Sequence, residues 1–569
     1  LCRFVSSADA GAQISMDSAG LEVTAEQLLS LIDIAEVIER KYDVVVTNPP
    51  YMAVSNGGAR LNDYVKKNYP DSKADLFAVF IERCGLMTEQ NRYQAMITQH
   101  AWMFLSSFEK LREKLLQKDT VNMAHLGPRA FEEIGGEVVQ TTSFVLRKSH
   151  ITDYNGTYCR LIEPTTQQGK EDMFLAGKNR YTAQQSNFSK IPGSPIVYWC
   201  SNNVLHCFEH MEPLGKKYIL LAGTSTGDNT LYQRQWYEVC YGAISRTAPE
   251  DVSKRWYPCN TGGDFRKYSL NSTTIIDWEN DGYRIKHHVN QKGNIGSAVR
   301  NRQYYFAEGI TWNKISSSNF GVRYVPKGYI SDDTARMISV NSEERWSLMG
   351  FLCSKVAHHF LKILSATLSF TNSELQKIPV SDKIYVTKCA ELTEQNYQFS
   401  VRDNIAFETS WDFAGHPLAP LSHDRQEQET SQVHSFRIEK FGRVAWHYEK
   451  WKLKCEDRFA KLKANEEELN RIFIDIYDLQ DELSPEVKDK DVTVRKADLQ
   501  RDIKSLLSYA VGCMFGRYSL DVEGLAYAGG EWDESKYKTF LPDADGIIPI
   551  TDEEYLGDDI VTRLCSWLK

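Results

Sequence analysis

The chain has 569 residues, an ordinary globular composition and a net charge of −9 at pH 7. The length predicts roughly two to four domains with ample cores, and the negative charge argues against indiscriminate nucleic-acid binding. With no secretory signal and no apolar run long enough to span a bilayer, we expect a cytoplasmic protein without a membrane partner. The 12 cysteines form no CxxC pair and no zinc-like Cys/His cluster, so neither disulfides nor a bound metal is expected.

Residues 24–40 carry apolar positions at helical spacing and predict a helix that leads into the run 42–46. That run is β-branched and has no charge after Asp43. It predicts a strand buried on both faces, as in a parallel α/β sheet.

The strand is followed by Asn-Pro-Pro-Tyr, residues 48–51. Pro49 and Pro50 end it because they remove two amide donors and fix two φ angles. The carboxamide of Asn48, beside a proline-fixed carbonyl, can accept two hydrogen bonds from one planar amino group, and Tyr51 adds an aromatic face. This combination suits a stacked base whose exocyclic amine attacks an electrophilic methyl group.

The next segments alternate between helix and strand. Helices are predicted at 75–87 and 107–116, and strands at 93–98, 121–125 and 138–147. Such alternation indicates an α/β fold, half of a doubly wound, Rossmann-like sheet, which we assign to a domain at residues 1–150.

These segments resemble the amino-group DNA methyltransferases that use S-adenosyl-L-methionine, in which (D/N/S)PP(Y/F/W) follows a strand and NPPY belongs mostly to adenine-N6 enzymes. The strings ADLFAVFIERCGLM, RYQAMITQHAWM and AFEEIGGEVVQTTSFVLRK match later motifs of that family. The resemblance implies that Asn48, Pro49, Pro50 and Tyr51 form the catalytic motif. It also implies that Phe131 packs against an extruded adenine opposite Tyr51.

In the same family a residue at the position of Asp75 lies near the cofactor's side of the site. Simpler interpretations stay open for each feature: a strand that ends in a turn without chemistry, a core aromatic for Phe131, and a helix N-terminal carboxylate for Asp75.

A complete domain of this order would carry a cofactor-binding glycine turn, such as DPxxGxG, before residue 48. We find none there, and the later glycine pairs do not follow a buried strand and open a helix. We therefore expect an internal fragment that lacks the main S-adenosyl-L-methionine loop and is inactive alone.

Residues 151–380 change to short strands, aromatics and Gly/Asn/Ser turns, which predicts a separate α+β recognition domain. Between residues 251 and 327, 12 Lys and Arg face 6 Asp and Glu and are interleaved with Trp, Tyr and Phe. Cations that neutralise phosphates and aromatics that stack on bases suit a DNA-reading surface, although a solvated loop face would also explain the charges. The predicted DNA-binding residues are Lys254, Arg255, Arg266, Lys267, Lys292, Arg300, Arg302, Lys314 and Arg323.

Residues 381–569 predict a mainly helical C-terminal domain. A distinctive stretch surrounds Trp411, and long helical patterns cover 433–477 and 499–515. Their charges indicate a solvated face, with an apolar seam that packs on a neighbouring domain.

Together with NPPY, the strings SWDF, EEELNRIFIDIYDLQDEL and YAVGCMFGRYSLDVEGLAYAGG resemble the PglX family, the adenine-specific DNA methyltransferases of bacterial BREX phage-defence systems. That resemblance covers essentially the whole chain. It implies N6 methylation of a flipped adenine in double-stranded host DNA as an antiviral self-mark. It also implies other BREX components and phage-encoded DNA-mimic inhibitors as partners.

Two other functions stay open. The chain could be a DNA-binding specificity or assembly subunit without catalysis of its own. It could also be part of a fused restriction and methylation enzyme, although the sequence shows no convincing PD…(D/E)xK nuclease arrangement.

Overall fold

A computed structural model describes residues 16–131, 139–248, 252–315, 319–365, 370–419, 443–552 and 555–569. Contacts within the chain separate two compact units, Leu1–Leu205 and His206–Lys569. No helix in the described ranges combines the length and the apolar character that a membrane crossing requires.

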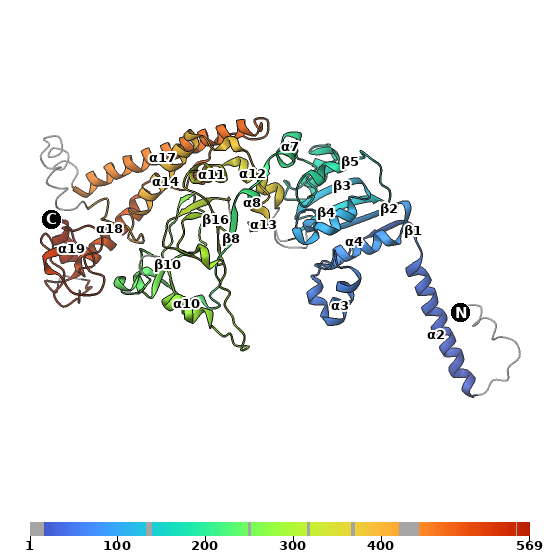
Figure 1. Ribbon diagram of the computed structural model, residues 1–569, viewed down its shortest axis with the longest axis horizontal. Helices are drawn as coiled ribbons and strands as arrows, with labels where there is room; N and C mark the ends of the chain where they lie inside the picture. The colour runs from blue at the N-terminus through green and yellow to red at the C-terminus, as the bar shows by residue number, and fades with distance from the viewer. Residues whose placement is uncertain are drawn as a thin grey trace. The chain divides into compact units, whose positions relative to one another are not determined.

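The first unit is built on a six-stranded sheet with the order β1-β2-β4-β3-β5-β6 (Figure 1). Its strands are β1 Tyr42–Thr47, β2 Thr88–Gln99, β3 Asp119–Pro128, β4 Gln140–Arg147, β5 Asn155–Arg160 and β6 Arg180–Gln184. β1 is parallel to β2 and β3 is parallel to β5, whereas β4 is antiparallel to both β2 and β3. The carboxyl ends of β1, β2, β3 and β5 therefore share one side of the sheet, which we call the carboxyl edge.

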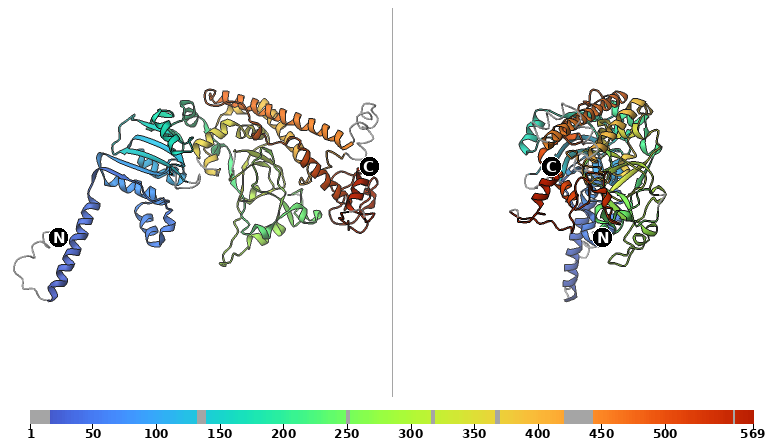
Figure 2. Two further views of the ribbon diagram at one scale, coloured as in Figure 1. Left: turned by 180° about the vertical axis from the view of Figure 1, so that it is seen from behind. Right: turned by 90° about the vertical axis from the view of Figure 1, so that its left-hand side faces the viewer.

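The helices of the first unit are α2 Met16–Glu39, α3 Gly58–Asn68, α4 Leu76–Met87, α5 Glu109–Leu115 and α6 Gln167–Leu175. α4 forms because Asp75 caps its first turn and because most of its apolar side chains are buried against β1 and β2. α2 confirms the helix predicted at 24–40 and extends away from the sheet as one long rod (Figures 1 and 2).

β1 corrects one prediction, because it is not buried on both faces. Val44 is 55% exposed and Val46 is 71% exposed. Among the described strands β1 pairs with β2 alone and stands first in the sheet order, so its outer side has no neighbour there. The β-branched run identified the strand correctly but could not distinguish a central strand from an edge strand.

The sheet also continues past the boundary predicted at residue 150. β5 adds to β3 in parallel and β6 adds to β5, so the first unit extends to Leu205. Stacked Tyr158 and Tyr198, with ring centroids 4.7 Å apart, pack this extension into the core. α7 Asn202–His210 spans the division between the two units.

The second unit contains three small sheets. One has the order β15-β10-β12-β9 and another the order β11-β14-β13-β16-β8, while β17 pairs with β7. The strands are β7 Glu212–Pro213, β8 Ile219–Ala222, β9 Gln233–Gln235, β10 Trp256–Asn260, β11 Tyr268–Ser269, β12 Thr274–Asp277, β13 Gly309–Asn313, β14 Val322–Val325, β15 Ile330–Ser331, β16 Ala335–Ser339 and β17 Pro379–Val380.

Helices and loops make up the rest of this unit, and α14 lies alongside α17 (Figures 1 and 2). The helices are α8 Leu214–Lys217, α9 Asn229–Tyr232, α10 Glu279–Lys286, α11 Arg345–Leu352, α12 Lys355–Leu364, α13 Asn372–Leu375, α14 Thr387–Asn404, α17 Arg443–Ile476, α18 Leu499–Met514 and α19 Ile560–Leu568. α17 and α18 agree with the two predicted helical stretches; residues 433–442 of the first lie outside the described ranges.

The recognition and C-terminal regions, which we predicted as separate domains, form one compact unit. Trp411 illustrates the reason: its indole nitrogen donates to the Ser272 carbonyl at 2.5 Å, and its ring stacks on Trp236 at 5.8 Å. The distinctive stretch around Trp411 therefore packs the helical region against the sheets.

Candidate functional site

The 48–51 turn begins directly after β1, at the carboxyl edge. Pro49 is buried and anchors the turn, whereas Asn48 and Pro50 are exposed. The Asn48 carboxamide has no hydrogen-bond partner among the described residues, so its oxygen is available as an acceptor. That this acceptor holds an amino group stays a prediction.

Tyr51 is fixed at both ends of its side chain. Its hydroxyl donates to the Ile97 carbonyl of β2 at 3.2 Å, and its ring meets Phe77 edge-on at a centroid distance of 6.3 Å. Burial raises the pKa of the Tyr51 hydroxyl to about 12, so the phenol stays neutral. The neutral ring is held against the sheet while the side chain stays partly accessible.

Asp75 ties the turn to α4. Its Oδ1 atom accepts from the backbone nitrogen of Met52 at 3.0 Å and from that of Phe77 at 3.3 Å. The Leu76 nitrogen donates back to the Met52 carbonyl at 3.0 Å. Burial raises the pKa of the Asp75 carboxyl, and the backbone donors offset part of that rise. The N-terminal helix cap is thus confirmed, and the predicted cofactor contact stays a prediction.

Phe131 lies three residues after the end of β3, which is also on the carboxyl edge, and its side chain is partly buried. The chain that follows it, residues 132–138, lies outside the described ranges. The edge therefore brings the 48–51 turn and Phe131 to the same side of the sheet, while their stacking around a base stays a prediction.

Two histidines occupy the same edge and were missed by the sequence analysis. His100 follows β2 directly and His125 lies near the end of β3, and their ring nitrogens Nδ1 and Nε2 are 2.8 Å apart. The other nitrogen of His125 lies 3.3 Å from the Tyr198 hydroxyl. The signal that could have found His100 is its place immediately after a strand parallel to the one that precedes the 48–51 turn.

Both histidines are neutral at neutral pH. Burial lowers the pKa of His100 to about 4 and, together with the neighbouring cations, lowers the pKa of His125 to about 3. A neutral imidazole pair can share one proton, so one ring donates and the other accepts. The pair therefore joins the ends of β2 and β3 by a hydrogen bond and places no charge at the carboxyl edge.

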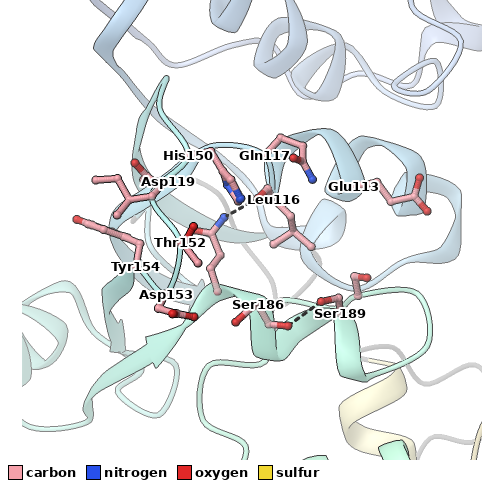
Figure 3. Close-up of a pocket in the computed structure, with 13 residues that line it drawn as sticks. Glu113, Leu116, Gln117, Asp119, His150, Thr152, Asp153, Tyr154, Ser186 and Ser189 are labelled. Atoms are coloured by element: carbon pink, nitrogen blue, oxygen red, sulfur yellow. Dashed lines mark hydrogen bonds between the residues drawn. The ribbon is translucent and has the colours of Figure 1, made fainter.

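A cavity of about 310 Å³ lies at the edge of the sheet opposite to the carboxyl edge, where β3 begins and β4 ends (Figure 3). The Asp119 carboxylate on its wall accepts from Ser149 and from the Ile151 nitrogen at 2.8 Å. Gln185 accepts from the Thr120 nitrogen at 2.8 Å and donates to the Lys118 carbonyl at 2.5 Å. These groups satisfy one another, and the cavity is separate from the 48–51 turn.

The predicted DNA-binding cations are partly paired. Arg255 binds Asp277 at 2.9 Å, Arg300 binds Asp333 at 2.9 Å, and Arg302 binds Asp281. Lys314 lies 3.6 Å from Asp333, and Lys254 is partly exposed. The basic stretch consequently presents less free charge than its residue count indicates.

Two of the predicted cations, Lys267 and Arg323, are buried inside the unit, and this corrects the sequence interpretation. Lys267 is 8% exposed and binds both carboxylate oxygens of Glu466 at 3.0 Å. Arg323 is 4% exposed and donates to the Asn313 side chain at 2.6 Å; burial lowers its pKa to about 10. Arg266 donates to Asn404 at 2.9 Å. Buried charges need partners, so Lys267 and Arg323 stabilise the interior, whereas Arg266 is partly exposed.

Lys292 is the exposed cation at the tip of a tight hairpin after α10. The Asn290 side chain accepts from the Lys292 and Asn294 nitrogens at 3.0 and 3.2 Å. Below the tip, Val289 and Ile295 bridge each other and are 57% and 68% exposed. The sequence analysis missed this apolar pair.

The base of the hairpin is held firmly. The Ser225 and Ala298 backbones exchange two hydrogen bonds, of 3.0 and 2.8 Å, and a His288 ring nitrogen lies 3.2 Å from the Tyr232 hydroxyl. The hairpin thus exposes two large apolar side chains beside a lysine, which makes it a candidate interaction site.

The hydrogen-bond acceptors near the 48–51 turn suit part of a bound S-adenosyl-L-methionine. Asn48 is exposed, and Oδ2 of Asp75 has no partner among the described residues, so both can accept hydrogen bonds. In the described part of the chain no three His, Cys, Asp or Glu side chains are grouped to hold a metal ion.

Residues 14–127 match the family model of the Eco57I restriction-modification methylases. The chain is 42% identical to "Adenine-specific methyltransferase PglX" of Lacticaseibacillus casei (strain Zhang), over 100% of this chain and 47% of that protein. It is 32% identical to "Adenine-specific methyltransferase BrxX" of Escherichia coli O9:H4 (strain HS), over 96% of this chain and 45% of that protein. The chain thus spans about half the length of these curated relatives.

Among solved structures, the type IIL restriction-modification enzyme MmeI in complex with DNA aligns at 10% identity and a TM-score of 0.45. The alignment covers 77% of this chain and 54% of that one. This likeness is too distant to bear on function. The sequence relatives confirm the predicted resemblance.

Proposed function

We propose, from the premise that this chain is homologous over its whole length to the PglX-type adenine-specific methyltransferases, that it carries the catalytic turn and DNA-recognition surface of a DNA adenine-N6 methyltransferase. The observation that carries the proposal is the 48–51 turn at the carboxyl edge, with an unpartnered Asn48 carboxamide above a buried Pro49. In this proposal S-adenosyl-L-methionine supplies the methyl group.

The turn acts through position and hydrogen bonding. Asn48 accepts a hydrogen bond from one N–H of the adenine amino group, and the carbonyl of Pro49 accepts one from the other N–H, which draws the nitrogen lone pair out of conjugation with the ring. Tyr51 supports one face of the base, and Phe131 supports the other. Fixing the amine in line with its methyl donor removes much of the entropic cost of the reaction.

The adenine must leave the DNA duplex to reach this turn, and extrusion costs on the order of a few kcal/mol. We assign part of the compensating DNA contact to the hairpin that bears Val289, Lys292 and Ile295. Exposed apolar side chains on a rigid hairpin suit insertion beside bases, and the lysine suits a phosphate. Arg255, Arg300 and Arg302 extend this surface with partly neutralised charge.

The biological role follows from the same premise. Methylation would mark one short motif of double-stranded host DNA, and other BREX components would act on unmarked phage DNA. An acidic, DNA-mimicking phage protein would compete for the same surface, because it presents the charge pattern that the cations recognise.

The test is single-molecule sequencing of N6-methyladenine in cells that express the complete gene or its Asn48→Ala form. We expect one motif to lose its mark in the variant while the purified variant still binds DNA. Marks that persist in the variant would overturn the catalytic role of Asn48. If both forms leave the DNA unmarked but bind it, a specificity or assembly subunit becomes the better description.

A further inference from the structure

A second cavity, of about 370 Å³, lies in the helical region of the second unit and belongs to neither site described above. It is open to solvent on one side and is bordered by the start of α12, by the segment that follows α17 and by Phe320. The lining side chains that matter are Lys355, Lys362, Lys488, Lys490 and His358.

The cavity wall is strongly basic. Lys362, Lys488 and Lys490 have no ion-pair partner among the described residues, and Lys355 donates to the Ser484 carbonyl at 2.9 Å. Among the described residues that line the wall, Asp491 is the one carboxylate, and it already accepts from Asn319 at 2.8 Å. The remaining lysine, Lys267, is neutralised by Glu466.

His358 faces this wall with unsatisfied nitrogens. Both Nδ1 and Nε2 are buried and have no hydrogen-bond partner within the described ranges. Burial and the charges of Lys362, Lys267 and His359 lower its pKa to about 4. Leaving two buried polar atoms without partners is costly, and such atoms in a native protein point to a missing water or ion.

The N-terminus of α12 adds positive electrostatic potential to that of the lysines. Ser354 caps the helix by accepting from the Ala357 nitrogen at 3.4 Å, and Asn470 accepts from the Lys355 nitrogen at 2.9 Å. The positive end of the helix dipole therefore opens at the cavity, where an anion would be stabilised.

We propose that this cavity is a binding site for a phosphate group, held by Lys362, Lys488 and Lys490 and by an N–H of His358. Lysines are point-charge partners for phosphate, and the imidazole supplies a directed donor. The phosphate comes either from the DNA backbone or from a free phosphate compound. The two sources share this chemistry and are separated by the experiment below.

The test measures the melting temperature of the complete protein against inorganic phosphate, with sodium chloride at matched ionic strength as the reference. We expect a saturable rise with phosphate only. Lys362→Gln should weaken phosphate binding about tenfold, because a charged hydrogen bond contributes about 1.5 kcal/mol. His358→Phe should abolish the rise while keeping the phosphate-free melting temperature at or above that of the wild type.

Lys452→Gln is the matched control, because Lys452 is exposed on α17 and does not line the cavity. No rise over chloride in the wild type, or an equal rise in wild type, Lys362→Gln and His358→Phe, would overturn the proposal.

The source of the phosphate is then determined from the DNA affinity of the protein, measured at several salt concentrations. A salt slope that falls by about 0.9 in Lys362→Gln assigns the site to a DNA backbone phosphate. An unchanged slope in a variant that has lost phosphate binding assigns it to a free phosphate compound.

Discussion

Asp75 joins two parts of the candidate site, because its Oδ1 atom lies 3.0 Å from the backbone nitrogen of Met52, the residue after the 48–51 turn. The same atom caps α4 through Phe77. One carboxylate thus fixes the exit of the turn relative to the helix that packs on β1 and β2. The position of Asn48 therefore depends on a side chain that need not touch the base.

Replacing Asp75 by alanine should reduce both stability and methylation. We expect a loss of about 1 kcal/mol in the free energy of unfolding, as for other N-caps, measured by urea denaturation of the complete protein. The methylation rate should fall in the same variant, because the turn loses its tie through Met52.

Asp75→Asn is the matched control, because its amide oxygen can still accept from Met52 and Phe77. Asp75→Asn should retain the methylation rate and should be at least as stable at neutral pH, because burial raises the pKa of the native carboxyl. That raised pKa makes the wild type lose stability, relative to Asp75→Asn, as pH rises through it. If Asp75→Asn loses methylation as severely as Asp75→Ala, the carboxylate has a direct role, such as the cofactor contact.

Two substitutions of Tyr51 distinguish the role of its ring from the role of its hydroxyl hydrogen bond. Tyr51→Phe removes the donation to the Ile97 carbonyl and should cost about 1 kcal/mol of stability. It should retain methylation, because the ring face remains, whereas Tyr51→Ala should lose most of it. Single-turnover methylation of a DNA duplex measures both; equal losses in the two variants would mean that the hydroxyl, not the ring, is required.

The lowered pKa of His125 predicts that acid destabilises the first unit. Its pKa is lowered to about 3, so the folded state binds fewer protons than the unfolded state below the ordinary histidine pKa of about 6.5. Stability should therefore fall as pH drops from about 6.5 towards 3. The fall should be shallower in His125→Phe, measured by urea unfolding between pH 5 and 7.

His150→Gln is the control for this experiment, because His150 is exposed in the same unit. It should follow the wild-type pH dependence. A wild-type slope in His125→Phe would assign the acid sensitivity to other buried groups, namely His100 in the same unit or His358 and His416 in the second unit, whose pKa values are also lowered to about 4.

The local sequence pattern was sufficient to predict several helices and strands of the first unit. The β-branched run before Asn48 predicted β1, the two prolines predicted its end, and helical spacing predicted α4. Burial could not be predicted in the same way, because it depends on neighbours that are distant in sequence. Val46 belongs to a strand with one partner in the described sheet, and Lys267 meets its carboxylate 199 residues later, at Glu466.

Residue type was also an incomplete guide to the site. A basic stretch indicated DNA binding, but Asp277 and Asp281 within it and Asp333 just after it pair with several of its cations. His100 and His125 become neighbours only when β2 and β3 point the same way in the sheet. Val289 and Ile295 carry no charge or motif, and their exposure is visible only in the folded hairpin.

The hairpin leads to the last prediction, which concerns DNA binding without chemistry. Val289→Ser combined with Ile295→Ser should weaken the affinity of the complete protein for its methylated motif, because the apolar contacts with bases are lost. Both side chains are more than half exposed, so the melting temperature should change little. Lys292→Gln should instead lower the salt slope of binding by about 0.9, because one phosphate contact is removed.

The matched control is Ile219→Ser, since Ile219 is 55% exposed on β8 of the same unit and does not belong to the hairpin. Fluorescence anisotropy with a labelled duplex at several salt concentrations measures all variants. Unchanged affinity in the Val289→Ser/Ile295→Ser variant would remove the hairpin from the DNA interface while leaving the catalytic role of Asn48 intact. Equal weakening by Ile219→Ser would mean that the effect is not specific to the hairpin.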